Sequence, residues 1–529
     1  MPESELSGQD HGLGAEVVDR STAIGETFVD PERRRKLEVA QSRGVIYWVF
    51  AGIALVLLSE QASFDFLLYN PILGDLAAKY HTSNVVWVMT GLNLAAAVAL
   101  PLFSRLADIY GKKRSIGIAG SVTMLGCLIG AVAPTFTVLI VGRVLMGAGV
   151  AFGVLAVVAI REVFPVRARA IAIAVTVNGA GLIIVGGPLL AGWLADQWGV
   201  SAPFWFQLIL CALSVVMVMV LVPESPVRVR SRVDYLGAVL LGAGLFCLLI
   251  GLGQVTSLGW GSFTLGFTAA GAVLFALWLL QLRRSTQPLI NPKLLKNRAI
   301  LTTTVSAAFL NGTVVTLNVV IVLMWSTPRA VARYGHDLTP FDIAIWTIPF
   351  AVLTVAGGVL VGLTVRSVGY RTYMILSGVF MVASAVLLAV NLESSAAVLI
   401  ASYALGGLGS MFMAASSSLV LLASPPDQRG IVSGVSKSMA TIAASVVQVL
   451  VFSVLAASVL TVVGGVAVFA EGGYRVGLLT AAAVAAAGLI AAVLIPHGRP
   501  QPRHRMVDDV TSTVAAAPLA TERPAARKF

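Results

Sequence analysis

Charged side chains are scarce in this sequence. Asp, Glu, Lys and Arg make up 12% of the 529 residues, whereas hydrophobic residues make up 57%. Soluble domains carry about twice that charged fraction. The low charge therefore excludes an ordinary soluble protein and indicates a polytopic helical membrane protein.

Metal-ligating and phosphate-binding patterns are missing as well. The three cysteines, Cys127, Cys211 and Cys247, each lie inside an apolar run and are spaced neither as metal ligands nor as a disulfide framework. The apolar runs contain no His, Asp and Glu cluster with ligand spacing, and no Gly-x-x-x-x-Gly-Lys-Ser/Thr loop occurs. We therefore expect no metal, no other cofactor, no ATPase and no membrane-embedded enzyme.

The net charge of +11 does not indicate nucleic-acid binding. Lys and Arg occur in short loops between apolar runs and do not form one patch or stripe. The first forty residues lack the apolar core and small-residue cleavage site of a signal peptide. Residues 496–529 are rich in Pro, Arg and Ala, which predicts a disordered cytoplasmic tail.

Long apolar runs, in contrast, are frequent. A helix of about 20 residues crosses roughly 30 Å of hydrocarbon. Runs that reach about this length lie at residues 45–72, 84–106, 115–133, 137–160, 170–195, 203–222, 235–255, 263–282, 299–326, 341–365, 371–390, 396–423, 431–456 and 474–495. With Met1 inside, the outer loops contain only four of the 36 basic residues: Lys79, Arg329, Arg333 and Arg475. Because cytoplasmic loops attract Lys and Arg, we expect fourteen helices with both termini in the cytoplasm.

The loop between the second and third runs reads SRLADIYGKKR, residues 104–114. A tight connection between two helices favours glycine, and an Asp near a helix end can pair with cations or with a helix N-terminus of a neighbouring bundle. The loop resembles the signature of the major facilitator superfamily, although Ser104 and Ile109 depart from it. Four residues fit the signature: Asp108, Gly111, Lys112 and Lys113. The resemblance implies that they form a conformational latch. An ordinary positively charged cytoplasmic loop is the alternative.

A second copy of this loop lies in the other half of the chain. Residues 362–371, GLTVRSVGYR, repeat the spacing, with Gly369 at the place of Gly111 and Arg366 at the place of Asp108. Weak symmetry between halves is typical of transporters built from parallel repeats.

Two further motifs lie within the fourth and fifth runs. GRVLMGAG, residues 142–149, is similar to the superfamily's Arg-x-x-x-Gly-x-Gly pattern. A lone Arg in a span is costly unless it faces protein or water, so Arg143 is a functional candidate, with snorkelling to the outer surface as the alternative. NGAGLIIVGGPLLAG, residues 178–192, resembles the motif of proton-coupled exporters. Its matching residues are Gly187, Pro188 and Gly192, although packing alone also favours small residues.

Fourteen runs with these motifs are similar to the drug:proton antiporter branch (QacA/EmrB-like) of the superfamily. The resemblance implies an all-α membrane fold of two six-helix bundles and two inserted helices. The expected divisions are a cytoplasmic tail at 1–43, a first bundle at 44–227, an insertion at 228–298, a second bundle at 299–495 and a tail at 496–529.

The resemblance also implies a function. We expect a monomeric, proton-coupled exporter in the bacterial inner membrane that moves small amphipathic or cationic drugs by alternating access. Its partners would be the substrate, protons and the lipid bilayer. A same-fold exporter of one metabolite, siderophore, lipid or self-made antibiotic is the first alternative. A transport-inactive scaffold or sensor is the second, because Arg366 replaces the acid of the second loop.

The first run contains two acids in the stretch SEQASFDFLLYN, residues 59–70. The family's first helix carries Asp followed five residues later by Asn, and Asp65 and Asn70 keep that offset. The resemblance therefore implies that Asp65, with Arg143, couples protons. Glu60 is the rival because it lies nearer the middle of the run, and helical geometry turns it about 140° from Asp65. The alternative to a role in proton coupling is that Asp65 simply lies at the outer water boundary.

Polar residues at helical spacing predict a substrate cavity. Asn311 and Asn318 lie seven residues apart on the ninth run, with Thr304 on the same stripe. Lys437 and Gln448 share a stripe on the thirteenth run. Single amides on other runs complete the candidates: Asn93, Asn178 and Gln207. Hydrogen bonds between helices are the alternative role for each.

Overall fold

The computed structural model describes residues 26–29, 31–178, 180–230, 234–255, 259, 261–285, 297–424, 429–463 and 466–498. The elements of the first half are β1 (Glu26–Val29), α1 (Pro31–Gln41), α2 (Val45–Leu67), α3 (Leu73–Lys79), α4 (Trp87–Tyr110), α5 (Lys112–Val132), α6 (Phe136–Met146), η1 (Gly147–Ala151), α7 (Phe152–Val163), α8 (Val166–Asn178), α9 (Ala180–Trp198), α10 (Ala202–Leu221) and β2 (Val227–Arg230).

The second half continues the helical pattern. Its elements are α11 (Tyr235–Gly253), α13 (Ser262–Arg284), α14 (Arg298–Ser326), α15 (Pro340–Val368), α16 (Tyr370–Val390), α17 (Ala396–Gly409), α18 (Phe412–Leu422), α19 (Arg429–Ala456), β3 (Val459–Val463), β4 (Val466–Phe469) and α20 (Glu471–Val493). The regular elements of the described residues are helical except for two short antiparallel strand pairs, β1 with β2 and β3 with β4, which the sequence patterns did not predict.

Thirteen helical segments in the described residues are long and apolar enough to cross a membrane. They correspond to thirteen of the predicted runs. The predicted run at 170–195 is not among them. It coincides with α8 and α9, and residue 179 between these two helices is not among the described residues.

The first helix ends earlier than expected. The sequence predicted a span over residues 45–72, but α2 ends at Leu67 and the chain turns before α3 begins at Leu73. Pro71 explains the end, because proline has no N–H to donate and restricts Asn70 before it. Asp65 consequently lies in the last turn of α2.

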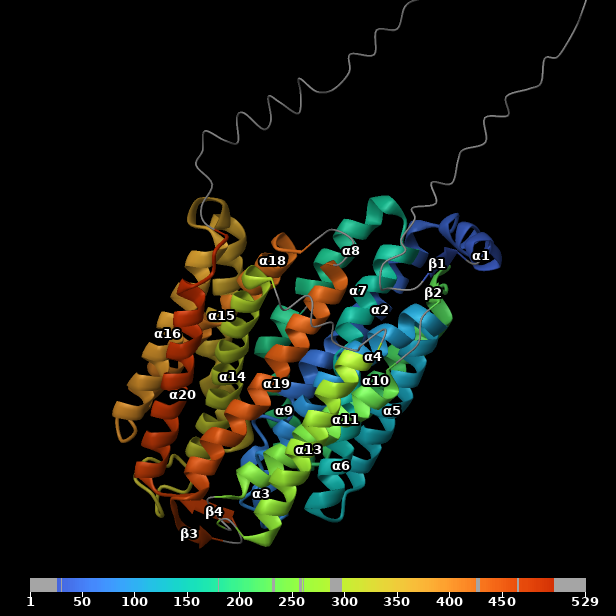
Figure 1. The fold of residues 1–529 in the computed structure, drawn as a ribbon. Coiled ribbons are helices and arrows are strands. Elements are labelled where there is room, and N and C mark those ends of the chain that lie inside the picture. The colour runs from blue at the N-terminus through green and yellow to red at the C-terminus, as the bar shows by residue number, and fades with distance from the viewer. Residues whose placement is uncertain are drawn as a thin grey trace, which may run out of the picture.

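The helices pack as two groups with a helix pair beside them (Figure 1). Helices α2 and α4 to α10 form the first group, and α14 to α20 form the second. Helices α11 and α13 pack on each other, and α11 also contacts α4 and α19. The two groups meet where α9 packs on α15 and where α4 packs on α19.

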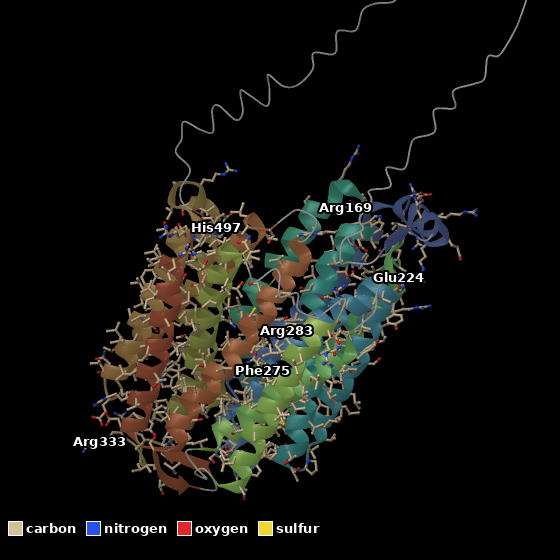
Figure 2. All side chains as sticks on the ribbon, in the orientation of Figure 1. Arg169, Glu224, Phe275, Arg283, Arg333 and His497 are labelled. Carbon is tan, nitrogen blue, oxygen red and sulfur yellow. The ribbon has the colours of Figure 1, made fainter. Side chains whose placement is uncertain are left out.

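The bundle has two distinct ends. Helix α1 with β1 and β2 marks one end, and α3 with β3 and β4 marks the other (Figure 1). We name these the α1 end and the α3 end. Among the labelled side chains, Arg169 and Glu224 lie toward the α1 end and Arg333 lies at the α3 end (Figure 2). Helix α13 buries only Thr264, Gly271 and Trp278 of its described residues, as expected for a peripheral membrane helix that packs on one neighbour, α11.

Candidate functional site

Asp65 lies inside the first helix group, and its side chain is completely buried. Its Oδ1 accepts a hydrogen bond from Nε2 of Gln207 on α10, whereas its Oδ2 has no partner among the described residues. Gly149 on η1 makes room for it, since a β-carbon there would lie 3.1 Å from Oδ2. Asp65 is therefore enclosed by protein, and the alternative of an acid at the outer water boundary does not hold.

Arg143 on α6 is also completely buried, next to Asp65. Its Nη2 donates to the main-chain carbonyl of Asp65 at 2.8 Å, and its Nε donates to the carbonyl of Val88 on α4 at 3.0 Å. The guanidinium carbon lies 3.9 Å from the ring centre of Tyr69, in a cation–π contact. Arg143 thus joins the end of α2 to α4 and does not snorkel to the surface.

Main-chain carbonyl groups and the aromatic ring of Tyr69 surround the positive charge of Arg143. In the described part of the chain, no ion pair within 4.0 Å joins Arg143 to a carboxylate. Instead, two of its N–H groups donate to main-chain carbonyl oxygens, and the flat face of the guanidinium lies over the ring of Tyr69. Such an arrangement holds the guanidinium in place without an ion pair to the Asp65 carboxylate.

Glycines in the fourth span explain how its helix approaches its neighbours. Helices α6 and α7 are joined by the 3-10 turn η1, which contains Gly147 and Gly149. A β-carbon at Gly147 would lie 2.5 Å from the β-carbon of Ala95 on α4, so only glycine fits. The Arg-x-x-x-Gly-x-Gly spacing therefore places Arg143 against α4 and leaves space for Asp65.

Glu60 lies on a different face of α2 from Asp65. Its side chain is buried, with 4% of its surface exposed, and its Oε2 has no hydrogen-bond partner among the described residues. Neither the hydrogen bonds nor the ring contacts of Arg143 involve it. The structure therefore brings Asp65, Arg143 and Gln207 together and leaves Glu60 outside this cluster.

The loop motif forms the turn between α4 and α5 at the α1 end. Gly111 has a φ of 108°, which explains the glycine. Lys112 Nζ lies 3.4 Å from Asp108 Oδ1 and 3.1 Å from Glu162 Oε1 on α7. The main-chain N–H of Lys113 donates to Glu224 at 3.1 Å. In this structure Asp108 is thus paired within its own helix group, and the two glutamates are partners that the motif did not reveal.

The second copy of the loop has a matching backbone. Gly369, between α15 and α16, has a φ of 84° and a ψ of 144°, close to the 108° and 150° of Gly111. The two turns therefore share a backbone conformation with positive φ at the matching glycine.

Gly187, Pro188 and Gly192 lie on α9, which packs on both α2 and α15. A β-carbon at Gly187 would lie 3.2 Å from the β-carbon of Leu67. At Gly192 it would lie 2.6 Å from the Cα of Phe341, so the two backbones nearly touch. The motif therefore provides close packing across the boundary between the helix groups.

The predicted cavity amides mostly make hydrogen bonds between helices. Gln448 Oε1 on α19 accepts from Nδ2 of Asn93 on α4 at 3.1 Å, and both side chains are buried. Asn311 donates to the carbonyl of Ala440 at 3.3 Å. Asn93 and Gln448 thus connect the two helix groups. The side chain of Asn178 lies outside what the structure describes.

Asn318 connects three segments near the α3 end. Its Oδ1 accepts from the hydroxyl of Tyr403 at 2.7 Å, and its main-chain carbonyl accepts from Nδ2 of Asn70 at 3.3 Å. The second contact crosses between the helix groups. The predicted cavity role of these amides therefore stays a prediction, while their role in packing is visible.

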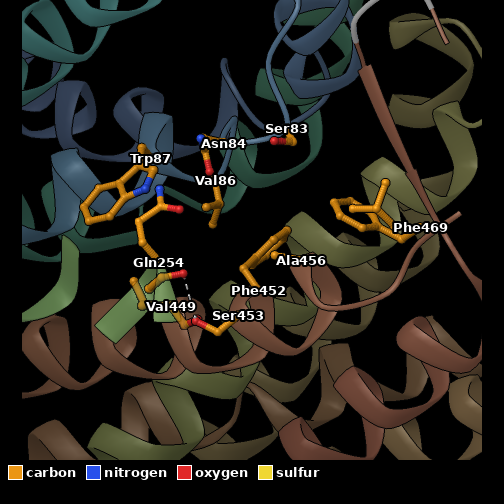
Figure 3. Close-up of a pocket in the computed structure, with 12 residues that line it drawn as sticks. Ser83, Asn84, Val86, Trp87, Gln254, Val449, Phe452, Ser453, Ala456 and Phe469 are labelled. Atoms are coloured by element: carbon orange, nitrogen blue, oxygen red, sulfur yellow. Dashed lines mark hydrogen bonds between the residues drawn. The ribbon is translucent and has the colours of Figure 1, made fainter. Parts of the chain in front are cut away.

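Two pockets open at the α3 end. The first, of about 280 Å³, is lined by Trp87, Gln254, Phe452 and Phe469 (Figure 3). The second, of about 450 Å³, is lined by Asp75, Asp196 and Tyr474. Burial and the nearby Asp196 charge raise the pKa of Asp75. Among the described residues, no group of three His, Cys, Asp or Glu side chains could hold a metal ion.

Comparisons with known proteins agree with this architecture. A model of the Major Facilitator Superfamily matches residues 49–448. The multidrug resistance protein Stp of Mycobacterium tuberculosis is 27% identical over 405 residues, which cover 74% of this chain and 73% of that protein. The tetracenomycin C resistance and export protein of Streptomyces glaucescens is 27% identical over 407 residues, which cover 74% of this chain and 71% of that protein.

The crystal structure of the peptide transporter POT in complex with sulfate has a TM-score of 0.60. The match covers 88% of this chain and 97% of the transporter at 14% identity, which supports the fold alone. The family match also confirms the resemblance to the major facilitator superfamily. This multi-pass integral membrane protein therefore belongs to the Major Facilitator Superfamily, whose members carry small molecules across membranes.

Proposed function

We propose that this protein exports small amphipathic drugs and toxic compounds from a bacterial cell in exchange for protons. The observation that carries the proposal is the buried Asp65 carboxyl, whose Oδ2 has no partner among the described residues, beside the buried Arg143. The names of two relatives, a multidrug resistance protein and an antibiotic export protein, support the direction and the class of cargo.

The proposed topology has fourteen membrane helices, with both termini in the cytoplasm. Helices α8 and α9 together would form the fifth span, across residue 179. The basic segments near Arg33, Lys112 and Arg169 favour a cytoplasmic α1 end, because positive charge is retained inside. The two helix groups would be the two six-helix bundles, with α11 and α13 inserted between them, and the protein would act as a monomer in the inner membrane.

Contacts near the α3 end support an arrangement closed toward the outside. Asn70 donates to the carbonyl of Asn318 across the groups, and Gly192 lies against Phe341. A β-carbon at Gly74 would lie 2.6 Å from Oγ of Ser326, so α3 also approaches α14 closely. Rocking of the two bundles about the centre would separate these contacts and open the outer side.

Asp65 would then couple the proton to this movement. A protonated carboxyl carries no charge and loses its desolvation cost, whereas the ionised form favours arrangements that supply water or a cation. Proton and substrate drive the cycle if they prefer different arrangements of the bundles. Arg143 would fix the end of α2 and supply a constant positive charge beside Asp65.

Dye movement in everted membrane vesicles tests this proposal. An imposed proton gradient, acidic inside the vesicle, is expected to drive accumulation of fluorescent amphipathic dyes, and an uncoupler should release them. Vesicles without the protein provide the background. If the gradient moves no dye or drug from a structurally varied set, the antiporter function is refuted.

An exporter of one self-made antibiotic is the second candidate. It is favoured by the similarity to the tetracenomycin C resistance and export protein. Accumulation of a single compound class in the same vesicles, with others excluded, would support this candidate over a broad drug exporter.

Gly192→Val is expected to lower gradient-driven transport about tenfold. A side chain at this position would force apart α9 and α15, and overpacking of this kind costs about 1–3 kcal/mol. Gly186→Val on the same helix is the matched control, because nothing lies within 4 Å of its β-carbon position. Rates are compared at equal amounts of membrane-inserted protein. Normal transport by Gly192→Val would show that this contact is not part of the cycle.

A further inference from the structure

Lys437 is an exposed cation within a membrane-spanning segment. It lies on α19, six residues into the apolar stretch that begins at Val432, and its side chain is exposed. It forms no ion pair within 4.0 Å in the part of the chain that the structure describes. A charged side chain at this depth requires water or a counter-charge. The groups around Lys437 therefore indicate what it binds.

The packing of α19 shows which way Lys437 points. Gln448, eleven residues further on, lies within about 20° of the same helical face and binds Asn93 on α4 across the two groups. Ser436, about 100° to one side, contacts Thr304 on α14 at 2.9 Å. Lys437 therefore points between α14 and α4, into the space between the two helix groups.

The lipid-facing side of α19 lies on the opposite face. Val446 is 43% exposed and Leu450 is 49% exposed, and both lie about 140–180° around the helix from Lys437. Figure 1 shows α19 between α14 on one side and α4 with α11 on the other. The exposure of Lys437 is thus exposure to an interior space and not to hydrocarbon.

The described helices around this space place no carboxylate against Lys437. Helices α14, α11 and α18, which pack on or near α19, contain no Asp or Glu. The one acid of α4, Asp108, pairs with Lys112, and that of α20, Glu471, lies at the α3 end. The two acids of α2 are buried. Lys437 therefore has no protein carboxylate facing it from these helices.

We propose that Lys437 is the anchor of a binding site for anionic amphipathic molecules, such as carboxylates or phenolates with an apolar body. A cargo of this kind supplies the missing counter-charge, whereas a cationic cargo is repelled. The inference rests on the proposed export function and narrows its substrate class, because it replaces the expectation of cationic drugs with anionic ones.

A pair of dyes with one skeleton and opposite charge tests the site. Full-length protein in phosphatidylcholine nanodiscs is titrated with fluorescein methyl ester, an anion at mildly alkaline pH, and with the matched rhodamine methyl ester, a cation. Fluorescence anisotropy measures both affinities. We expect the wild type to prefer the anion, and Lys437→Gln to bind the anion about tenfold more weakly without losing affinity for the cation.

Two variants control the measurement. Lys437→Arg keeps the charge and is expected to retain the preference for the anion. Lys79→Gln removes the same charge from an exposed position at the end of α3 and is expected to change neither affinity. Preference of the wild type for the cation, binding of neither dye, or an equal effect of Lys437→Gln on both dyes would overturn the proposed site.

Gradient-driven movement of the same dyes separates this inference from the proposed function. Anion binding that depends on Lys437, without proton-driven movement of any compound, would support the site and refute the exporter. Proton-driven movement of the cation, unchanged in Lys437→Gln, would support the exporter and refute the site.

Discussion

Asp65→Asn is expected to abolish proton-driven dye accumulation in everted vesicles while leaving dye binding within about threefold of wild type. Asparagine has nearly the same shape, and its amide oxygen can still accept the hydrogen bond from Gln207. It cannot exchange a proton at physiological pH. The variant therefore removes the titratable group and keeps the packing around Gly149 and Arg143.

Glu60→Gln is the matched control for this prediction. Both acids lie on α2 and are buried, but only Asp65 lies against Arg143. We expect Glu60→Gln to keep most of the gradient-driven transport. Loss of coupling in Glu60→Gln with normal transport by Asp65→Asn would reverse the assignment and make Glu60 the proton carrier.

Arg143→Gln is expected to abolish transport and to lower the melting temperature of the purified protein by about 5 °C or more. The substitution removes two charge-assisted hydrogen bonds to the carbonyls of Asp65 and Val88, each worth about 1.5–3 kcal/mol, and the contact with the Tyr69 ring. Both carbonyls are then left without this donor inside the bundle.

Arg114→Gln provides the control for this second prediction, because Arg114 is exposed on α5. Thermal unfolding is followed by light scattering or intrinsic fluorescence in one detergent for all variants. Arg143→Lys keeps the charge but cannot reach two carbonyls in the same plane, and it should regain only part of the stability. Unchanged stability and transport in Arg143→Gln would show that Arg143 is dispensable.

The helical layout could be predicted well from the sequence, because hydrocarbon thickness sets the length of each span. The end of the first helix could not. The apolar run predicted a span over residues 45–72, but α2 ends at Leu67, before Pro71 and the turn into α3. Asp65 therefore lies in the last turn of α2, where the neighbouring helices bury it completely.

The partners of the site were less predictable than its members. Asp65, Arg143 and Gln207 were all candidates, but Arg143 binds main-chain carbonyls. A sequence pattern does not identify such partners, because every residue has a carbonyl. Tyr69 under the guanidinium lies one turn from Asp65, and that spacing was the available signal.

The amides show a different limit. Asn93 and Gln448 were predicted as parts of a cavity, and in this structure they bind each other across the two helix groups. Asp108 likewise binds Lys112 in its own group, where a contact with the other group was expected. Such contacts depend on which arrangement of the bundles is populated, and one sequence encodes every arrangement of the cycle.

The helix pair α11 and α13 has a consequence for how molecules dissolved in the membrane reach the protein. Helix α11 rests on both α4 and α19, and Leu94, Leu241 and Val435 form one apolar cluster there. The contact between α4 and α19 is therefore shielded from the lipid acyl chains by α11 and α13. In the described residues, α9 and α15 meet without such a cover. Among the described residues, α11 and α13 thus separate the bilayer from the α4–α19 contact, whereas a lipophilic compound in the bilayer meets the α9–α15 contact directly.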